Sequence, residues 1–234
     1  MNRSAIIIQA RMSSARFPGK MMSNISGMPL VRYIYERCKR SSVKDVIVAT
    51  SDDASDDVMY KYCKDNGIQI MRGSLDNVLK RYIQAADLVG AEYIVRVCGD
   101  TPLVDIMLIE KLLDMLASGG FGYVAPDRGS CAPAFYSEAV TLQALKKAIG
   151  LTMSKEGLEH VTKYILDNEK VFNARLIDAK LNPDFIKATR LTIDYPEDLD
   201  RVNAVINELR DRLHFSSEDV LDIVRKNSCR CDRS

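Results

Sequence analysis

A cluster of cations and hydroxyl groups follows the first apolar run of the chain. The run ends at Gln9, and the ten residues from Arg11 to Lys20 include a third cation, Arg16, two serines and a Pro-Gly pair. Guanidinium and ammonium groups beside free backbone amides bind phosphate groups well. The segment therefore predicts a polyphosphate-binding loop, although an ordinary basic surface loop has the same composition. It contains neither of the glycine-rich nucleotide motifs G-x-x-x-x-G-K-[ST] and G-x-G-x-x-G.

Two carboxylates stand where apolar runs end. Asp100 follows residues 93–97 in the segment CGDTPL, and Asp194 follows residues 188–193 in the segment LTIDYPEDL. Mg²⁺ takes few protein carboxylates, retains waters and bridges substrate phosphates. Two aspartates facing the basic loop would therefore make a site for a nucleoside triphosphate. Taken singly, each aspartate is also typical of a turn or of a helix start.

The elements that position these residues alternate between strands and helices in the first half of the chain. Buried β-branched runs predict strands, and apolar residues at helical spacing predict helices. The predicted strands are 5–9, 46–49, 68–71 and 93–97, and the predicted helices are 30–40, 55–66 and 77–89. Such alternation indicates βαβ units and a parallel sheet with helices on both faces. Ligands bind beyond the carboxyl ends of strands in such sheets, where the basic loop and Asp100 are expected.

The second half of the chain is less regular. The patterns there predict helices at 106–117, 137–149, 158–168, 197–213 and 217–226, and strands at 123–125, 171–177 and 188–193. There is no internal repeat and no low-complexity segment. We expect a single α/β domain over residues 1–234, with a flexible tail at 227–234.

Composition excludes several classes of protein. The chain has 33 Lys and Arg against 32 Asp and Glu, whereas nucleic-acid-binding proteins usually carry a strong basic excess. No apolar run reaches the length of a signal-peptide core or of a membrane span. Six scattered cysteines and two histidines argue against a disulfide framework and against a zinc site. We expect a reduced cytoplasmic protein that binds neither nucleic acid nor membrane.

Six segments occur in order between residue 6 and about residue 202. They are IIIQARMSSARFPGK, VIVATSDDASDD, MRGSLDNVLKRY, RVCGDTPLVD, EHVT and RLTIDYPEDLDRV. Together they resemble the cytidylyltransferase family, and within it the spore-coat polysaccharide branch, related to the CMP-sialic acid and CMP-Kdo synthetases. The resemblance implies a three-layer α/β fold with a mostly parallel sheet, of the nucleotide-diphosphosugar-transferase (glycosyltransferase-A-like) type. It also implies transfer of CMP from CTP to an anionic acceptor, with release of pyrophosphate.

The resemblance assigns roles to individual residues. Arg11 and Lys20 match the triphosphate-binding cations, and Asp100 and Asp194 match the two Mg²⁺-binding aspartates, so these four are the expected catalytic residues. The other residues expected around the nucleotide are Ala10, Met12, Ser13, Arg16, Arg72, Ser74 and Asp76. Glu159 and His160 fall where related enzymes contact the acceptor, although His160 could equally cap or pack on its helix.

The acceptor is less well defined than the nucleotide. The resemblance favours a sugar acid, and in particular a nonulosonic acid for surface glycans, with a phosphonate or a polyol phosphate as the alternative. The Kdo synthetases carry an acidic residue at the position of Thr101, which argues against a Kdo-like acceptor. Cys131, Pro133 and Phe135 lie in a segment that would line the acceptor pocket or merely connect two elements.

Two further expectations concern organisation and class. Residues 5–105 would form the nucleotide-binding half and residues 106–215 the acceptor-binding and dimerisation half. A homodimer is expected, with the helix at 137–149 and the strands after it as candidates for the interface. The competing hypothesis is a non-catalytic nucleotide-binding or regulatory module, which would have no need of both metal-binding aspartates.

Overall fold

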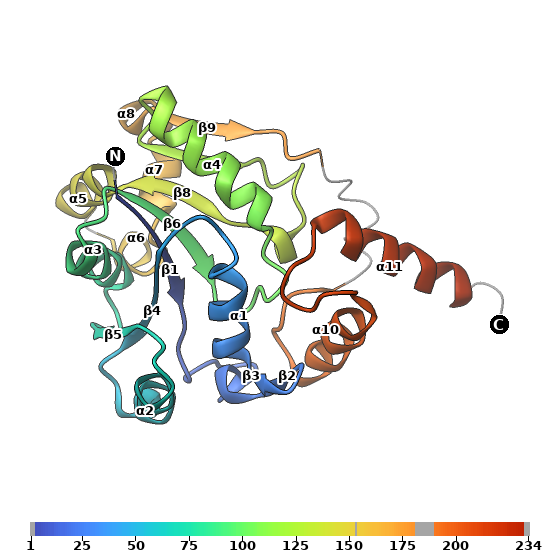
Figure 1. The fold of residues 1–234 in the computed structure, drawn as a ribbon. Coiled ribbons are helices and arrows are strands. Elements are labelled where there is room, and N and C mark those ends of the chain that lie inside the picture. The colour runs from blue at the N-terminus through green and yellow to red at the C-terminus, as the bar shows by residue number, and fades with distance from the viewer. Residues whose placement is uncertain (1–2, 153, 181–189, 232–234) are drawn as a thin grey trace.

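A seven-stranded sheet forms the centre of the computed structural model, which describes residues 3–152, 154–180 and 190–231. The strands lie side by side in the order β5-β4-β1-β6-β8-β7-β9 (Figure 1). Their bounds are β1 Ser4–Gln9, β4 Asp45–Ser51, β5 Ile70–Gly73, β6 Tyr93–Cys98, β7 Tyr123–Pro126, β8 Glu138–Thr141 and β9 Ala174–Ile177. A separate small hairpin joins β2 Asn24–Ile25 to β3 Met28–Pro29.

The direction of the strands decides where their loops meet. Strand β1 pairs in parallel with both β4 and β6, and β4 pairs in parallel with β5. Strand β8 runs antiparallel to its neighbours β6 and β7, so β6 and β7 point the same way, and β9 is parallel to β7. The loops that follow β1, β6 and β7 therefore open at one edge of the sheet.

Helices cover both faces of this sheet and complete three layers (Figure 1). One face carries α1 Leu30–Cys38, α2 Asp57–Asp65, α4 Ile106–Gly119, α10 Pro196–Glu208 and α11 Ser217–Cys231. The other carries α3 Val78–Val89, α5 Leu142–Leu151, α6 Lys155–Glu159, α7 Lys163–Asp167 and α8 Glu169–Phe172. Three short 3-10 helices are η1 Lys20–Met22, η2 Ala54–Asp56 and η3 Pro133–Phe135. The predicted three-layer α/β fold with a mostly parallel sheet is confirmed.

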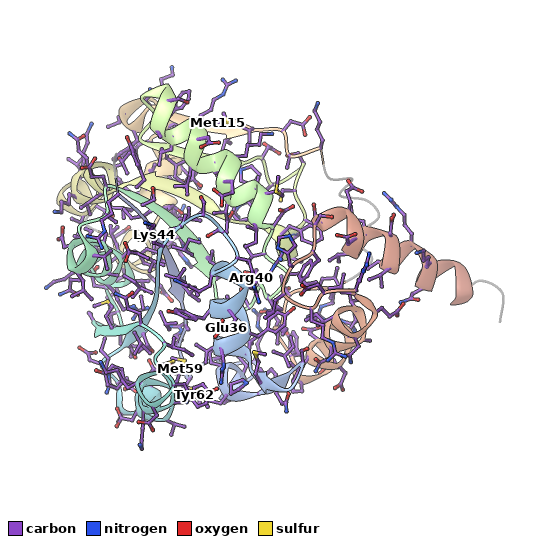
Figure 2. The ribbon with its side chains drawn as sticks, in the orientation of Figure 1. Glu36, Arg40, Lys44, Met59, Tyr62 and Met115 are labelled. Atoms are coloured by element: carbon purple, nitrogen blue, oxygen red, sulfur yellow. The ribbon has the colours of Figure 1, made fainter. Side chains whose placement is uncertain are left out.

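The first strand shows why the sheet needs helices on both sides. Ile6 and Ile8 pack into the core on one face, while Ala5 and Ile7 pack into the core on the other. A strand that is apolar on both faces is stable only when both are covered. From the covering layer, Met59 of α2 points toward α1 (Figure 2). No helix of the described residues is long and apolar enough to cross a bilayer.

The predicted helix at 137–149 is wrong in its first part. Its first residues form the strand β8, which pairs Glu138 with Arg96 and Thr141 with Tyr93. The helix α5 begins only at Leu142, where the Thr141 hydroxyl accepts a hydrogen bond from the Ala144 amide at 3.0 Å. The apolar spacing alone could not reveal this change, because it depends on a strand forty residues earlier.

Later elements also differ from the sequence prediction. The helix predicted at 158–168 is interrupted at His160, between α6 and α7. The strand predicted at 171–177 begins only after Asn173, which adopts a left-handed conformation with φ 46° at the end of α8.

The C-terminal region also departs from its predicted boundaries. Of the strand predicted at 188–193, residues 188–189 lie outside the described residues and residues 190–193 form no strand. The helix predicted at 197–213 ends at Glu208. Residues 227–231, expected as part of a tail, continue α11, and 232–234 lie outside the described residues.

Strand β8 brings a buried carboxylate into the middle of the sheet. Glu138 accepts hydrogen bonds from Arg96 and Thr162 at 2.9 Å on Oε2, and from Tyr123 at 2.9 Å and Tyr136 at 3.2 Å on Oε1. Burial raises the pKa of Glu138, but the attraction and hydrogen bonds of Arg96, with those of Thr162 and Tyr123, hold it below its usual range. The carboxylate is therefore ionised and balances the charge of the partly buried Arg96 guanidinium.

Breaking this ion pair should be costly. We expect Glu138→Gln to lower the free energy of unfolding by about 3 kcal/mol, because it leaves the Arg96 charge uncompensated inside the protein. Urea denaturation followed by circular dichroism measures the loss. Asp87→Asn, which removes the exposed Lys146–Asp87 pair, is the matched control and should change little. Equal losses in the two variants would contradict the assignment.

Candidate active site

The basic loop folds back on itself directly after β1. The Met12 carbonyl accepts hydrogen bonds from the amides of Ser14 and Gly19, both at 2.9 Å. Gly19 has φ +78°, a left-handed conformation that a side chain would strain, and it leads the chain into η1 at Lys20. The Pro-Gly pair thus closes the loop and places its cations around one end of β1.

A buried carboxylate fixes the base of this loop. Asp56, which is fully buried, accepts a hydrogen bond from the Met12 amide at 2.6 Å. Its second oxygen accepts bonds from the Thr50 hydroxyl at 2.7 Å and from the Ser51 amide at 2.9 Å, and also from the Ser51 hydroxyl. These hydrogen bonds satisfy both oxygens of the buried Asp56 carboxyl group, with no cation among the donors. The end of β4 thereby anchors the loop that follows β1.

The loop after β6 approaches the end of β1 very closely. The Gly99 amide donates to the Gln9 carbonyl at 2.9 Å. A Cβ atom at Gly99 would lie 2.8 Å from that same carbonyl oxygen and 3.0 Å from Met21 Sδ. Glycine is therefore required here for the contact that brings Asp100 beside the basic loop.

A cavity of about 320 Å³, which we call the loop cavity, opens between the two loops. It is walled by Gln9, Ala10, Arg11, Ser14, Ala15, Arg16, Lys20, Met21, Cys98, Gly99, Asp100 and Asp194. The sequence therefore brings three cations and two carboxylates, from three distant segments, to one hollow at the carboxyl edge of the sheet.

Each aspartate of the loop cavity faces a cation. Lys20 Nζ lies 3.8 Å from Asp100 Oδ2 and donates to the Ile193 carbonyl at 2.7 Å. Lys20 is only 9% exposed, so its charge acts in a partly desolvated place. Arg16 forms an ion pair with Asp194. The Ile193 amide donates to the Asp100 carbonyl at 2.9 Å, which ties the two aspartate segments together.

The start of α10 holds Asp194 in place. The buried Asp198 accepts hydrogen bonds from the amides of Asp194 at 3.0 Å and Tyr195 at 2.9 Å. Burial raises the pKa of Asp198, but these backbone bonds and the Arg201 side chain hold it below its usual range. Pro196 occupies the first helical position, where its missing N–H is not needed. The Asp-Tyr-Pro-Glu-Asp segment is thus both a helix start and a support for Asp194.

The two aspartates of the loop cavity fit Mg²⁺. This ion is commonly bound through one or two carboxylates together with waters and substrate phosphates. Asp100 and Asp194 offer carboxylate oxygens to the same cavity, next to cations suited to phosphate. No group of three or more His, Cys, Asp or Glu side chains able to hold a metal occurs in the described part of the chain. Most other ligands of such an ion would therefore come from substrate and water.

A second cavity, of about 400 Å³, lies against the first, and we call it the adjoining cavity. The two share Arg16, Cys98, Asp100 and Asp194. The rest of the adjoining cavity is lined by Arg96, Thr101, Arg128, Cys131, Pro133, Tyr136 and Thr192. The predicted lining residues Cys131 and Pro133 are found there, whereas Phe135 is buried in the core.

Most of the predicted nucleotide-binding residues of the basic loop meet at the loop cavity. Ala10, Arg11, Arg16 and Lys20 line it, together with both aspartates, while Met12 and Ser13 belong to the loop without lining the cavity. The Arg11 guanidinium also lies 3.9 Å from the Glu159 carboxylate.

The segment around Arg72 does not reach the loop cavity. Arg72 donates to the carbonyls of Ser51 at 2.9 Å and Asp53 at 2.7 Å, and to the Asp57 carboxylate at 2.6 Å. All three contacts hold the turn after β4. Ser74 accepts a bond from the Asn77 amide before α3, and Asp76 is exposed. In this structure these residues support the fold beside the site.

Glu159 and His160 are not brought to the adjoining cavity. Both are exposed at the end of α6, and neither lines either cavity. The next residue but one, Thr162, is instead tied to the buried Glu138. The EHVT segment is therefore linked to the site in two ways. Thr162 bonds to Glu138, which holds the cavity residue Arg96, and the Glu159 carboxylate lies 3.9 Å from Arg11.

Several site residues escaped the sequence analysis. Gln9 and Cys98 end neighbouring strands and face each other in the sheet register, so strand pairing places both in the wall. Arg96 is a cation inside an otherwise apolar strand, which was a signal that a buried carboxylate or a ligand must lie opposite. Arg128 and Tyr136 lie in irregular segments that offered no such signal.

Comparison with known proteins agrees with this geometry. A family model described as cytidylyltransferase matches residues 5–220. The spore coat polysaccharide biosynthesis protein SpsF of Bacillus subtilis is 29% identical over 97% of this chain and 96% of its own length. The 3-deoxy-manno-octulosonate cytidylyltransferase of Geobacter sulfurreducens is 36% identical over 50% of this chain and 46% of its own length.

A solved structure extends the similarity to the whole fold. A cytidylyltransferase from Leptospira borgpetersenii superposes with a TM-score of 0.89 at 27% identity, covering 98% of this chain and 96% of that one. The family model spans the basic loop and both aspartates of the loop cavity. This chain therefore belongs to the cytidylyltransferase family and is a nucleotidyltransferase.

Proposed function

We propose that this enzyme transfers CMP from CTP to an anionic acceptor, with Mg²⁺ held by Asp100 and Asp194, and releases pyrophosphate. The observation that carries the proposal is the pair of cavities with one shared wall. The loop cavity has the cations for a triphosphate, and the adjoining cavity offers room for an acceptor on the other side of the same two aspartates.

The residues of the loop cavity would act chiefly through charge and position. Arg11 and Lys20 balance the negative charge that grows on the departing pyrophosphate. Mg²⁺, when bound, would polarise the phosphate oxygens and help to orient the triphosphate. The acceptor's oxygen attacks the α-phosphorus, the bond to the β-phosphate breaks and pyrophosphate leaves. A hydroxyl acceptor releases its proton to water.

The two halves of the chain would supply different parts of the site. Residues 5–105 supply the basic loop and Asp100, and residues 106–215 supply Asp194 and most of the wall found only in the adjoining cavity. A sugar acid for surface glycans is the acceptor that we propose, and the names of two relatives support it, one for spore coat polysaccharide and one for an octulosonate. A phosphonate or a polyol phosphate would use the same apparatus.

Pyrophosphate release provides the direct test. The enzyme is incubated with Mg²⁺, each of the four nucleoside triphosphates, and sialic acid, pseudaminic acid, legionaminic acid, Kdo, 2-aminoethylphosphonate or glycerol phosphate. We expect release with CTP and with an anionic acceptor of one of these classes. Binding of CTP without release for any acceptor would favour a nucleotide-binding module instead.

Removal of either aspartate tests the metal assignment. We expect Asp100→Asn and Asp194→Asn each to lower turnover by at least about 10²-fold at saturating Mg²⁺, because each removes a charged ligand of the metal ion that would act on the reacting phosphate. Asp114→Asn, at an exposed position of α4, serves as the control with unchanged turnover. Wild-type turnover in either site variant, with the fold intact by circular dichroism, would refute the assignment.

We also propose that the protein is a homodimer and acts in the cytoplasm. Strand β8 lies between β6 and β7, so the interface expected at 137–149 can involve only its helical part. The exposed apolar side chains of Val171, in the neighbouring helix α8, and of Leu176, in β9 itself, lie at the sheet edge formed by β9 and support an interface there.

Sedimentation velocity tests this interface. Leu176→Asp should shift the protein from dimer to monomer, because it places a charge in the apolar contact. Leu88→Asp changes an exposed leucine of α3 and should leave the dimer intact. A monomeric wild-type enzyme, or a Leu176→Asp variant that remains a dimer, would speak against it.

A further inference from the structure

The wall of the adjoining cavity holds more cations than the reaction at the aspartates requires. Three arginines line it, Arg16, Arg96 and Arg128, together with the two aspartates. Most of these charges are already balanced by a partner of opposite sign. An arginine without such a partner is available to bind an anionic ligand.

Two of the arginines already pair with a carboxylate. Arg16 pairs with Asp194 at the shared wall. Arg96 donates to Glu138 at 2.9 Å and to the Gln9 side chain at 3.3 Å, so its guanidinium is fixed by the sheet and its charge is compensated. Asp100 has Lys20 at 3.8 Å. Arg128 is therefore the cation of this wall that has no carboxylate partner among the described residues.

The position of Arg128 is defined by its loop. The turn after β7 is held by a bond from the Asp127 amide to the Ile177 carbonyl at 2.7 Å and by one from the Gly129 amide to the Asp127 carboxylate at 2.7 Å. The Ser130 hydroxyl accepts the Ala179 amide at 3.0 Å, which ties the turn to the chain after β9. The loop thus presents Arg128 from a hydrogen-bonded frame.

The side chain of Arg128 lies back over the cavity wall. Its guanidinium carbon is 6.0 Å from the centre of the Tyr136 ring. The Tyr136 hydroxyl is in turn fixed on Glu138 at 3.2 Å, so the ring is a firm support for a cation. Beside it, Cys131 and Pro133 give the cavity an apolar side.

We infer that the acceptor's anionic group, a carboxylate or a phosphate-type group, is bound by Arg128, with its carbon skeleton against Tyr136 and Pro133. Arginine presents a planar fork of donors that matches such groups in a bidentate manner. This inference rests on the proposed transfer reaction for the identity of the ligand as its acceptor. It assigns acceptor selection to the loop after β7 and not to Glu159 or His160.

Calorimetric titration of the panel acceptors into the enzyme tests the inference without turnover. We expect at least one carboxylate, phosphate or phosphonate compound to bind the wild type, and Arg128→Ala to weaken that binding by roughly 10- to 100-fold. Arg128→Lys should fall in between, because it keeps the charge and loses the fork. The carboxylates and the phosphorus-containing compounds form separate arms of the experiment. The class whose binding is weakened by Arg128→Ala identifies the anionic group that Arg128 binds. Glycerol, which is neutral, should bind neither protein.

Two controls separate a local effect from a general one. Arg40→Ala removes an exposed arginine just after α1 (Figure 2), which lines neither cavity, and should bind acceptors as the wild type does. CTP affinity should be unchanged in Arg128→Ala, because Arg128 does not line the loop cavity. Equal acceptor affinity in Arg128→Ala and wild type, or no binding of any panel anion by the wild type, would overturn the inference.

The same variants separate this inference from the proposed reaction. If acceptors bind through Arg128 but CTP yields no pyrophosphate, the subsite stands and the transfer reaction fails. If pyrophosphate is released with an acceptor KM that Arg128→Ala leaves unchanged, the reaction stands and the subsite fails.

Discussion

The hydrogen bond from the Gly99 amide to the Gln9 carbonyl is the contact on which the site depends. It continues the parallel pairing of β1 with β6 by one residue beyond the strands, at a point where only a residue without a Cβ atom can fit. The basic loop and Asp100 meet because these two strands are neighbours at the centre of the sheet. Asp194 joins them through the Ile193 amide, which bonds to the Asp100 carbonyl. Two backbone hydrogen bonds thus bring together three segments that lie far apart in the sequence.

The buried Glu138 holds together distant segments in the second half of the fold, as the Gly99–Gln9 contact does in the first half. Its strand interrupts the parallel order, and its carboxylate ties β6 to β7 through Tyr123 and to the segment after α6 through Thr162. Two of its partners, Arg96 and Tyr136, line the adjoining cavity. Stability and site shape therefore rest on the same ion pair, and a change at Glu138 would disturb both.

The sequence predicted the first half of the fold well because its signals are local there. Apart from the short β2–β3 hairpin, which was not predicted, each strand before residue 98 overlaps an apolar run, and each α-helix repeats its apolar residues at helical spacing, so no distant contact is needed to identify it. Strand β8 is different: four residues ahead of a helix become a strand because β6 and β7 offer them backbone partners. The site residues could likewise be predicted only where the signal was local. The loop cations and Asp100 could be found at strand ends, and Asp194 just before a helix start, whereas the pairing of Arg72 with the turn after β4 and the place of Arg128 depend on tertiary contacts that no local pattern records.

Thr101 shows how a single position can shift the balance of charge between the two cavities. The Thr101 hydroxyl donates to the Cys98 carbonyl at 2.8 Å and so closes the turn that carries Asp100. A carboxylate there would add a negative charge to the wall of the adjoining cavity, which Thr101 lines. It would offset the charge of Arg128 and weaken the attraction for an anion. With threonine in place, the turn is closed by a neutral hydroxyl and no further negative charge is added to the wall.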